Sequence, residues 1–350
     1  MNPMETQIPT MMRDAAISFP MLGNLTLDFP ASFSFSLFGH EFTIYMYGIV
    51  MAAAFLAAVF YASRKAPKLG IKSDDVFSLV LWVLPLAIVG CRIYYVIAQW
   101  DEFKDDLISI LYIWEGGIAM YGGTIAGALT IIIWSKCKKI PFPATLDMGG
   151  SALILGQVIG RWANFVNREA FGYQTDAFCR MGLTRPGHET VYVHPTFLYE
   201  SLWNLVGFLI INFFWYRKDH RKYDGQIFLF YVFWYGTGRA MVEGLRTDSL
   251  YIPGTGIRTS QLVAACSAVV ALALLLVNLK RPHKPRYVDV KAAAAAEAPA
   301  GPAAETAGPA EAVEPAEAKT EPAEAKAEPA ETEAGSAAGP DGAETEEKSS

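Results

Sequence analysis

Three arginines set within long apolar stretches are the residues of this sequence best suited to do chemistry. Arg92, Arg161 and Arg239 each lie inside or at the end of such a stretch. A guanidinium group stays charged when it is partly removed from water, and it can bind a phosphate through two parallel hydrogen bonds. Charged side chains in apolar segments are costly, so they usually mark a functional site or pair with one another. We therefore interpret these arginines as candidates for binding a phosphate.

Other polar side chains share this setting. They are Tyr47, Glu115, Tyr121, Asn164, His194, Tyr199, Glu200 and Glu243. A structural role is the alternative for each of them, since Arg239 and Glu243, four residues apart on one helix face, could simply satisfy each other. Pairing alone is a weaker explanation for three arginines, but the sequence leaves both interpretations open.

Seven long apolar runs must position these residues. The 350-residue chain is 52% hydrophobic and only 18% charged, whereas soluble domains carry about 25% charged residues. The runs are close in length to the roughly 20 helical residues that cross the core of a bilayer. We therefore expect an all-α, polytopic membrane protein with about seven transmembrane helices. The runs lie near 43–62, 76–98, 111–134, 145–165, 195–216, 226–244 and 258–279.

The basic residues predict the orientation of the chain. Fifteen lysines and arginines follow the first, third, fifth and seventh runs, against seven on the opposite side. Because cytoplasmic loops carry the excess of Lys and Arg, the N-terminus should lie outside and the C-terminus in the cytoplasm. The polar side chains named above then fall in the outer half of the membrane. An arginine-rich pocket at that depth suits the headgroup of an anionic phospholipid.

The runs divide the chain into three parts. Residues 1–40 are expected to form an external N-terminal arm, whose Phe33, Phe35 and Phe38 could lie on the membrane surface. Residues 41–288 form the predicted transmembrane domain that carries the site. Residues 289–350 are predicted to be a disordered, acidic Ala/Glu/Pro-rich cytoplasmic tail. From Ala292 onward the tail has 14 acidic residues, three lysines and no aromatic residue, so it accounts for the formal net charge of −6.

The cysteines and histidines lack the spacing of a metal site. Four cysteines and five histidines are scattered along the chain, and we interpret the cysteines as non-structural thiols. No metal is expected, and nucleic acid is not expected among the partners. The N-terminus lacks a basic segment followed by a short apolar core, so no cleaved signal peptide is expected either.

One segment carries a specific resemblance to a known family. Residues 160–172 read GRWANFVNREAFG, which is similar to the signature G-R-x-[GA]-N-F-x-N-x-E-x-x-G of the prolipoprotein diacylglyceryl transferases. Eight fixed positions within thirteen residues make this signal far more specific than a lone glycine motif. Shorter segments resemble the same family in the same order, so that the resemblance covers roughly residues 40–280. They lie at 45–48, 90–95, 114–117, 121–123, 194–200 and 238–243.

The resemblance implies a lipid-transfer reaction in the bacterial cytoplasmic (inner) membrane, with the active site toward the outer leaflet. The cysteine thiol of a prolipoprotein lipobox would attack the glyceryl carbon of phosphatidylglycerol that carries the phosphate. A thioether would form and glycerol phosphate would leave, as the first step of lipoprotein maturation. No metal or organic cofactor is implied. The expected partners are phosphatidylglycerol, the signal-peptide and lipobox region of prolipoproteins, and the lipid bilayer.

The resemblance also implies roles for individual residues. Arg161 would hold the phosphate, with Arg239 as a second electrostatic partner, while Asn164 and Glu169 would shape the headgroup site and Tyr47 would line the cavity. The full set of expected catalytic residues is Arg239, Glu243, Tyr121 and Tyr47. The expected substrate-binding residues are Arg161, Asn164, Glu169, Gly172, Arg92, Gly122 and Tyr199.

The sequence departs from the family at one position that matters for proton transfer. Many members carry a histidine where this chain has Tyr121. A free thiol has a pKa of about 8.5, so the reaction must raise its thiolate fraction or remove its proton during attack. Tyrosine, with a pKa of about 10, is a poor base at neutral pH. Glu243, Glu169 and His194 are the alternatives, and the sequence does not decide between them.

Three other functions compete with this interpretation. A transporter or lipid flippase should show inverted repeats and polar residues in both leaflets, whereas no repeat is visible here. A receptor-like scaffold acting through the acidic tail would leave the membrane charges unexplained. A different phospholipid-dependent transferase is the nearest competitor, and the thirteen-residue signature argues against it.

Overall fold

The structure is a computed structural model that describes residues 11–23, 25–252 and 254–297. The first ten residues, and the predicted disordered tail from residue 298 onward, lie outside the described residues. Helix α9 (Tyr287–Glu297) crosses the boundary at residue 289 where the tail was expected to begin.

Each of the seven apolar runs forms a helix. Five of the helices in the described residues are long and apolar enough to cross a membrane, namely those that begin at Met46, Ser73, Phe142, Thr196 and Thr259. This confirms a helical, polytopic membrane protein, while the number of spans and the orientation stay predictions. The seven helices are α1 (Met46–Lys65), α2 (Ser73–Ala98), α4 (Met120–Cys137), α5 (Phe142–Asn167), α6 (Thr196–Ile210, continued by a π-helical segment, Ile211–Arg217), α7 (Gln226–Glu243) and α8 (Thr259–Lys280).

The helix formed by the third apolar run, α4, begins later than the run predicts. The run starts near residue 111, but α4 starts only at Met120. Gly116 and Gly117, with φ angles of 98° and 68°, adopt a backbone conformation that does not belong to an α-helix and interrupt the run. Glu115 therefore lies in a loop. The loop contains helix α3 (Trp100–Phe103) and two short 3₁₀ turns (Leu107–Leu111, Ile113–Glu115).

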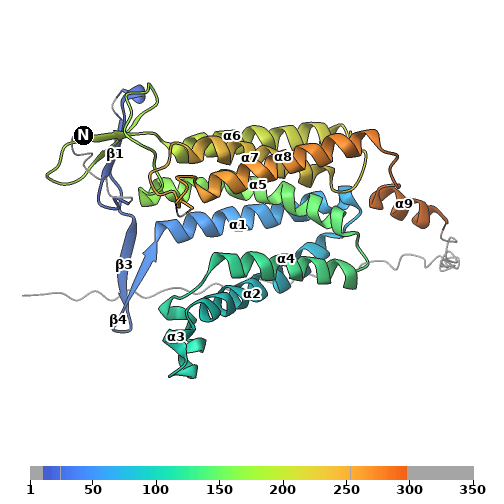
Figure 1. The fold of residues 1–350 in the computed structure, drawn as a ribbon, viewed down its shortest axis with the longest axis horizontal. Coiled ribbons are helices and arrows are strands. Elements are labelled where there is room, and N and C mark those ends of the chain that lie inside the picture. The colour runs from blue at the N-terminus through green and yellow to red at the C-terminus, as the bar shows by residue number, and fades with distance from the viewer. Residues whose placement is uncertain (1–10, 24, 253, 298–350) are drawn as a thin grey trace, which may run out of the picture. The chain divides into compact units, whose positions relative to one another are not determined.

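Helix α5 occupies the middle of the bundle. It packs against α1, α6 and α7, while α8 packs on α7 and α2 pairs with α4 (Figure 1). Small residues allow these backbones to approach closely. Gly122 of α4, for example, lies against the backbone oxygen of Gly90 in α2, where a Cβ atom would collide.

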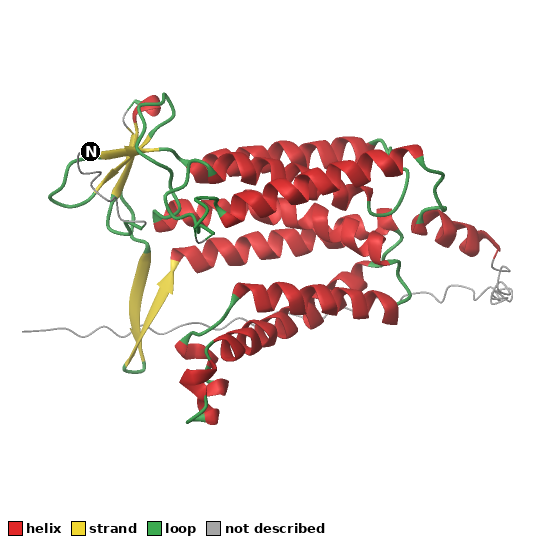
Figure 2. Ribbon diagram, viewed as in Figure 1, coloured by secondary structure: helices red, strands yellow, loops and turns green. Residues whose placement is uncertain are grey.

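Six short strands, which the sequence did not predict, lie at one end of the helices (Figure 2). Four of them form an antiparallel sheet in the order β2-β1-β5-β6, and its apolar side chains pack on Phe165 and Phe197 at the ends of α5 and α6. The other two form a separate hairpin that leads into α1. We call this the strand end of the bundle. The opposite end, which carries Lys65, Lys136, Lys218 and Lys280, is the lysine-rich end. The strands are β1 (Ala16–Phe19), β2 (Leu25–Leu27), β3 (Ser32–Leu37), β4 (His40–Tyr45), β5 (Met181–Thr184) and β6 (Val191–Val193).

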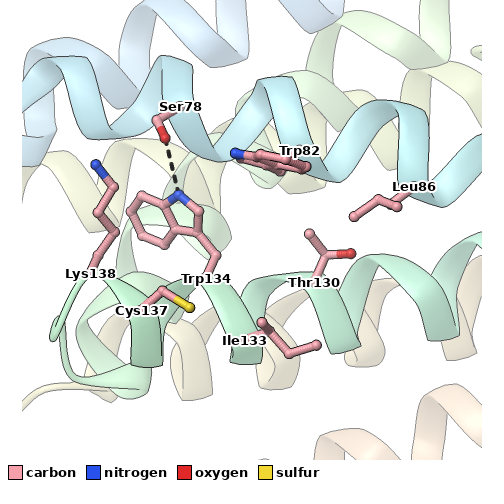
Figure 3. A pocket seen from close by; sticks show the side chains of 8 residues that line it. All are labelled: Ser78, Trp82, Leu86, Thr130, Ile133, Trp134, Cys137 and Lys138. Atoms are coloured by element: carbon pink, nitrogen blue, oxygen red, sulfur yellow. Dashed lines mark hydrogen bonds between the residues drawn. The ribbon is translucent and has the colours of Figure 1, made fainter.

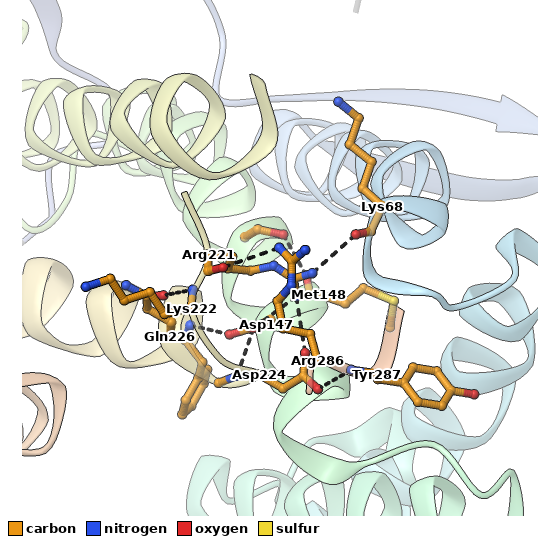
Figure 4. A network of polar contacts seen from close by, with 12 residues as sticks. Lys68, Asp147, Met148, Arg221, Lys222, Asp224, Gln226, Arg286 and Tyr287 are labelled. Atoms are coloured by element: carbon orange, nitrogen blue, oxygen red, sulfur yellow. Dashed lines mark hydrogen bonds and ion pairs between the residues drawn. The ribbon is translucent and has the colours of Figure 1, made fainter. Parts of the chain in front are cut away.

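A buried polar network holds the helices together at the lysine-rich end (Figure 4). Asp147 of α5 is fully buried and accepts hydrogen bonds from the backbone N–H groups of Gly225 (2.8 Å) and Phe228 (2.9 Å) at the start of α7. These N–H groups have no partner within their own helix. Arg221 lies 3.6 Å from Asp147 and 3.3 Å from Asp224, and Asp224 in turn accepts from the backbone of Tyr287 at 2.8 Å. The network therefore joins α5, α7 and α9.

Candidate functional site

Glu200 of α6 is the centre of an ion-pair cluster near the strand end. Its side chain is only 4% exposed. Arg161 of α5 approaches one carboxylate oxygen (Nη2–Oε2, 2.5 Å), and Arg239 of α7 approaches the other (Nη1–Oε1, 2.9 Å). Arg246, just after α7, lies 3.7 Å from Oε1. One buried carboxylate of α6 thus holds together guanidinium groups from two other segments that are far apart in sequence, namely α5 and the end of α7 with the loop that follows it.

Two further carboxylates complete the cluster. Arg239 also pairs with Glu243 on its own helix. Arg246 binds Asp248 through two hydrogen bonds, of 2.8 Å and 2.6 Å. Burial alone would lower the pKa of Arg246, but its contacts with Asp248 and the nearby glutamates raise it above its usual value. The pairing of Arg239 with Glu243 that the sequence allowed is present, and Arg239 reaches Glu200 as well.

The signature segment joins this cluster through a chain of hydrogen bonds. Arg161 donates to Asn164 Oδ1 at 3.4 Å, and Asn164 donates to Glu169 Oε1 at 2.9 Å. Asn167 donates to the other oxygen of Glu169 at 2.6 Å. The chain turns here because Arg168 adopts a positive φ of 47° directly after α5. The turn lets Glu169 fold back toward the last turn of the helix that carries Arg161 and Asn164.

A cleft of about 380 Å³ runs between α1 and α5 beside the cluster. Three predicted site residues, Tyr47, Arg161 and Asn164, line it together. Most of the remaining lining is apolar, and it extends along both helices toward the middle of the bundle. The lining residues are Tyr47, Met51, Ala54, Phe55, Ala58, Leu153, Gly156, Gln157, Gly160, Arg161 and Asn164. The arrangement combines cationic and amide groups with an apolar channel.

Tyr199 and Gly172 lie in the segments that surround the cluster. The Tyr199 hydroxyl is 3.2 Å from Nδ1 of His194 and 3.1 Å from the sulfur of Cys179. Burial lowers the pKa of His194, so its ring is neutral at physiological pH. Gly172 donates its backbone N–H to the His194 carbonyl at 2.9 Å, and a Cβ atom there would lie 2.7 Å from the Cβ of His194. Gly172 thus allows two loops to pack closely.

Arg92 lies outside the cluster. Its guanidinium donates to four backbone carbonyls, those of Ser109 (2.7 Å), Ile110 (2.8 Å), Gly116 (2.8 Å) and Gly117 (2.9 Å). It forms no ion pair within the part of the chain that the structure describes. These contacts hold the loop between α2 and α4, so the expected role of Arg92 in binding substrate stays a prediction.

Tyr121 and Gly122 are also separate from the cluster. The Tyr121 side chain is 69% exposed, and its ring lies 6.5 Å from that of Tyr94. Its hydroxyl makes no hydrogen bond with any described residue. Gly122, which faces Gly90 of α2, contributes a close helix–helix contact. Their expected roles in catalysis and substrate binding remain predictions.

The central positions of Glu200 and Arg246 were not predicted from the sequence. In the sequence, Glu200 is one polar residue of the fifth apolar run, and Arg246 is one of the seven basic residues expected on the outer side. A spacing signal was present for Arg246, because Arg239, Glu243 and Arg246, at i, i+4 and i+7, would share one face of a helix that continued past Glu243. No comparable pattern singles out Glu200, whose partners come from other segments.

A second cavity, of about 400 Å³, lies between α2 and α4 near the lysine-rich end (Figure 3). Trp82 and Leu86 line it from α2, while Ile133 and Trp134 line it from α4, and Trp134 donates to Ser78 at 3.2 Å. It contains none of the predicted site residues. Among the described residues, no group of three or more histidines, cysteines or acids is placed to hold a metal.

Comparison with known proteins shows the family of the chain. The family described as "Prolipoprotein diacylglyceryl transferase" matches residues 33–277. The chain is 44% identical over 239 residues to proteins from Streptococcus pyogenes serotype M5 (strain Manfredo) and serotype M1 that are named phosphatidylglycerol–prolipoprotein diacylglyceryl transferase. The match covers 67% of this chain and 90% of each relative. The chain therefore belongs to the prolipoprotein diacylglyceryl transferase family.

Proposed function

We propose that this protein transfers the diacylglyceryl group of phosphatidylglycerol to the lipobox cysteine of prolipoproteins, in the bacterial cytoplasmic membrane and at its outer leaflet. The observation that carries the proposal is the position of the arginine cluster beside the apolar cleft. A phospholipid has two parts that match this arrangement, because its anionic headgroup suits the arginines and its long apolar chains suit the cleft. Family membership and the names of the relatives support the same activity.

The reaction requires stabilisation of a departing phosphate. The thiolate sulfur forms a bond to the glyceryl carbon, the bond from that carbon to the phosphate oxygen breaks, and glycerol phosphate leaves with the electron pair. Negative charge therefore grows on the phosphate in the transition state, where positioned guanidinium groups stabilise it most. Arg161 lines the cleft itself, and Arg239 shares the carboxylate of Glu200 with it. These two arginines are the proposed phosphate ligands.

The charge balance of the cluster favours a carboxylate as the proton acceptor. Arg161, Arg239 and Arg246 are matched by Glu200, Glu243 and Asp248, so the cluster is formally neutral. A bound phosphodiester adds one negative charge in a site largely removed from water. This added charge favours protonation of a neighbouring carboxylate. The substrate thiol supplies the proton as it becomes the thiolate, so the proton moves within the site and the net charge of the site does not change.

The three candidates for this base differ in their surroundings. Glu169 already accepts amide hydrogen bonds on both oxygens, which suits it to holding the signature segment. His194 has a lowered pKa and is held by Tyr199, so it is neutral and able to accept a proton. Glu243 is a buried member of the charged cluster itself, and we favour it for that reason.

Mass spectrometry of a lipobox peptide tests the proposal. Purified full-length protein in phosphatidylglycerol nanodiscs should increase the mass of the peptide by one diacylglyceryl group. A peptide with serine in place of cysteine, and nanodiscs of phosphatidylcholine, should give no product. If folded protein leaves the cysteine peptide unmodified in phosphatidylglycerol, the proposed function is wrong.

A further inference from the structure

The β3–β4 hairpin has two chemically different faces. Residues directly opposite each other in an antiparallel pair lie on the same face, and successive pairs alternate between faces. The apolar face consists of the pairs Phe33↔Ile44, Phe35↔Phe42 and Leu37↔His40. The polar face consists of Ser32↔Tyr45, Ser34↔Thr43 and Ser36↔Glu41. The Phe35 and Phe42 rings are 5.7 Å apart, and the Ser34 and Thr43 hydroxyls are 2.8 Å apart, so each face is internally packed.

The apolar face is uncovered in the part of the chain that the structure describes. Its five large apolar side chains are between 37% and 48% exposed. Phe38 at the tip is 93% exposed, and its φ of 52° is unusual for a bulky residue. Among the described strands these two pair only with each other, and an isolated two-stranded hairpin is marginally stable in water. A contiguous apolar patch of this kind marks an interaction surface.

The connection to α1 indicates what covers this face. β4 ends at Tyr45, α1 begins at Met46, and the backbone N–H of Met46 donates to the Ala31 carbonyl at 2.9 Å, which closes the base of the hairpin. The hairpin therefore leaves the bundle where an apolar, membrane-spanning helix ends. Figure 1 shows it running crosswise to α1. Because a membrane-spanning helix runs roughly along the membrane normal, a hairpin crosswise to the end of such a helix follows the membrane plane at the interface, where aromatic side chains are enriched.

The polar face is oriented by the N-terminal segment. The Arg13 guanidinium lies 5.8 Å from the centre of the Tyr45 ring, on the polar face. Arg13 follows Met12, whose backbone N–H donates to the Arg168 carbonyl at the end of α5, and it precedes β1 of the four-stranded sheet. The polar face thus meets the segment that leads into this sheet, and the apolar face points away from that contact.

We propose that the apolar face of the β3–β4 hairpin, including Phe38, inserts into the leaflet at the strand end of the bundle, with the opposite face in water. A lipid surface fits better than a second copy of the chain, because the hairpin continues directly from a membrane-spanning helix. If the proposed function holds, insertion also sets the depth of the cleft mouth, since Tyr47 follows β4 by only two residues.

Spin labels on neighbouring residues test the insertion directly. In a background with Cys91, Cys137, Cys179 and Cys266 replaced, single cysteines are placed at Phe35 and Phe42 on the apolar face and at Ser36 and Thr43 on the polar face. Leu56, an exposed residue within α1, serves as the lipid reference, and His188 in an exposed loop as the water reference. The labelled proteins are reconstituted in phosphatidylglycerol nanodiscs, and collision with oxygen is compared with collision with a water-soluble nickel chelate.

The ratio of collision with oxygen to collision with the nickel chelate should be several-fold higher for the labels at Phe35 and Phe42 than for those at Ser36 and Thr43. Equal access of the nickel chelate to both faces would overturn the proposal, because the hairpin would then stand in water. Shielding of Phe35 and Phe42 from both reagents would also overturn it and would indicate a protein partner or a second copy. The measurement needs no catalytic activity, so its failure is distinct from failure of the proposed function.

Discussion

Replacing Arg161 by lysine separates the geometry of the guanidinium group from its charge. Arg161 uses one terminal nitrogen to reach Glu200 at 2.5 Å and the other to reach Asn164 at 3.4 Å, while it lines the cleft. A lysine keeps the positive charge but offers a single ammonium group, which cannot bind a phosphate side-on while holding both neighbours. The variant should therefore lose at least one charge-assisted hydrogen bond to the phosphate.

The expected loss follows from the value of that hydrogen bond. A hydrogen bond to a charged group contributes about 1.5–3 kcal/mol, and each 1.4 kcal/mol or so of transition-state stabilisation is a factor of ten in rate. We expect kcat/KM for phosphatidylglycerol to fall by about 10- to 150-fold in Arg161→Lys, as followed by mass spectrometry of the lipobox peptide. Because the phosphate contacts strengthen as charge develops, kcat should fall along with it.

Arg185→Lys is the matched control, since Arg185 is a partly exposed arginine whose partner is Asp14, outside the cluster. It should retain the activity of the unmodified protein. Near-normal turnover and lipid affinity of Arg161→Lys would refute the reasoning, and Arg161 would then be only a structural partner of Glu200. If Arg161→Lys does not elute as a folded protein, Arg161→Gln is measured in its place. Glutamine keeps hydrogen-bond donors but removes the charge.

Three further predictions follow from the described contacts. Tyr121→Phe should lose less than about a hundredfold in rate, the lower end of what positioned acid–base catalysis contributes, because the Tyr121 hydroxyl is outside the cluster. Tyr121→His should remain active. A folded but inactive Tyr121→Phe variant would show that the hydroxyl is essential. Asp147→Ala should lower stability by about 3–5 kcal/mol, since it leaves buried Arg221 without this partner, and thermal unfolding in detergent measures the effect against Asp74→Ala. Truncation after Glu297 should preserve specific activity, and a loss beyond about tenfold, roughly 1.4 kcal/mol, would mean that the tail takes part.

The helices could be predicted because membrane spans follow from run length and composition alone. A 26-residue helix such as α5 needs a long apolar sequence whatever it packs against. The six strands could not be predicted in the same way, because they are short and the four-stranded sheet depends on one pairing between distant segments. β1 pairs with β5, with Ile17 opposite Leu183, and no residue pattern within either segment predicts this pairing. The other pairings of the described strands, β1 with β2, β3 with β4 and β5 with β6, are local in sequence.

The site was predictable where one helix or one motif contains it. Arg161, Asn164 and Glu169 lie within nine residues of one another, and the structure links them by hydrogen bonds. Glu200 joins arginines from α5 and α7, a long-range relation that residue spacing does not reveal. Arg92 is a different case, since its position in an apolar run predicts a role in binding phosphate. In the structure its N–H groups donate to four loop carbonyls, and its role in binding substrate stays a prediction.

The balance of the two products tests the central claim most directly. Full-length protein in phosphatidylglycerol nanodiscs is given the lipobox peptide, and the modified peptide and free glycerol phosphate are measured in the same reaction. The account predicts that the peptide gains a diacylglyceryl group without phosphate, that one glycerol phosphate is released for each modified peptide, and that both fall together in Arg161→Lys. A peptide that retains the phosphate, or modification without release of glycerol phosphate, would contradict it.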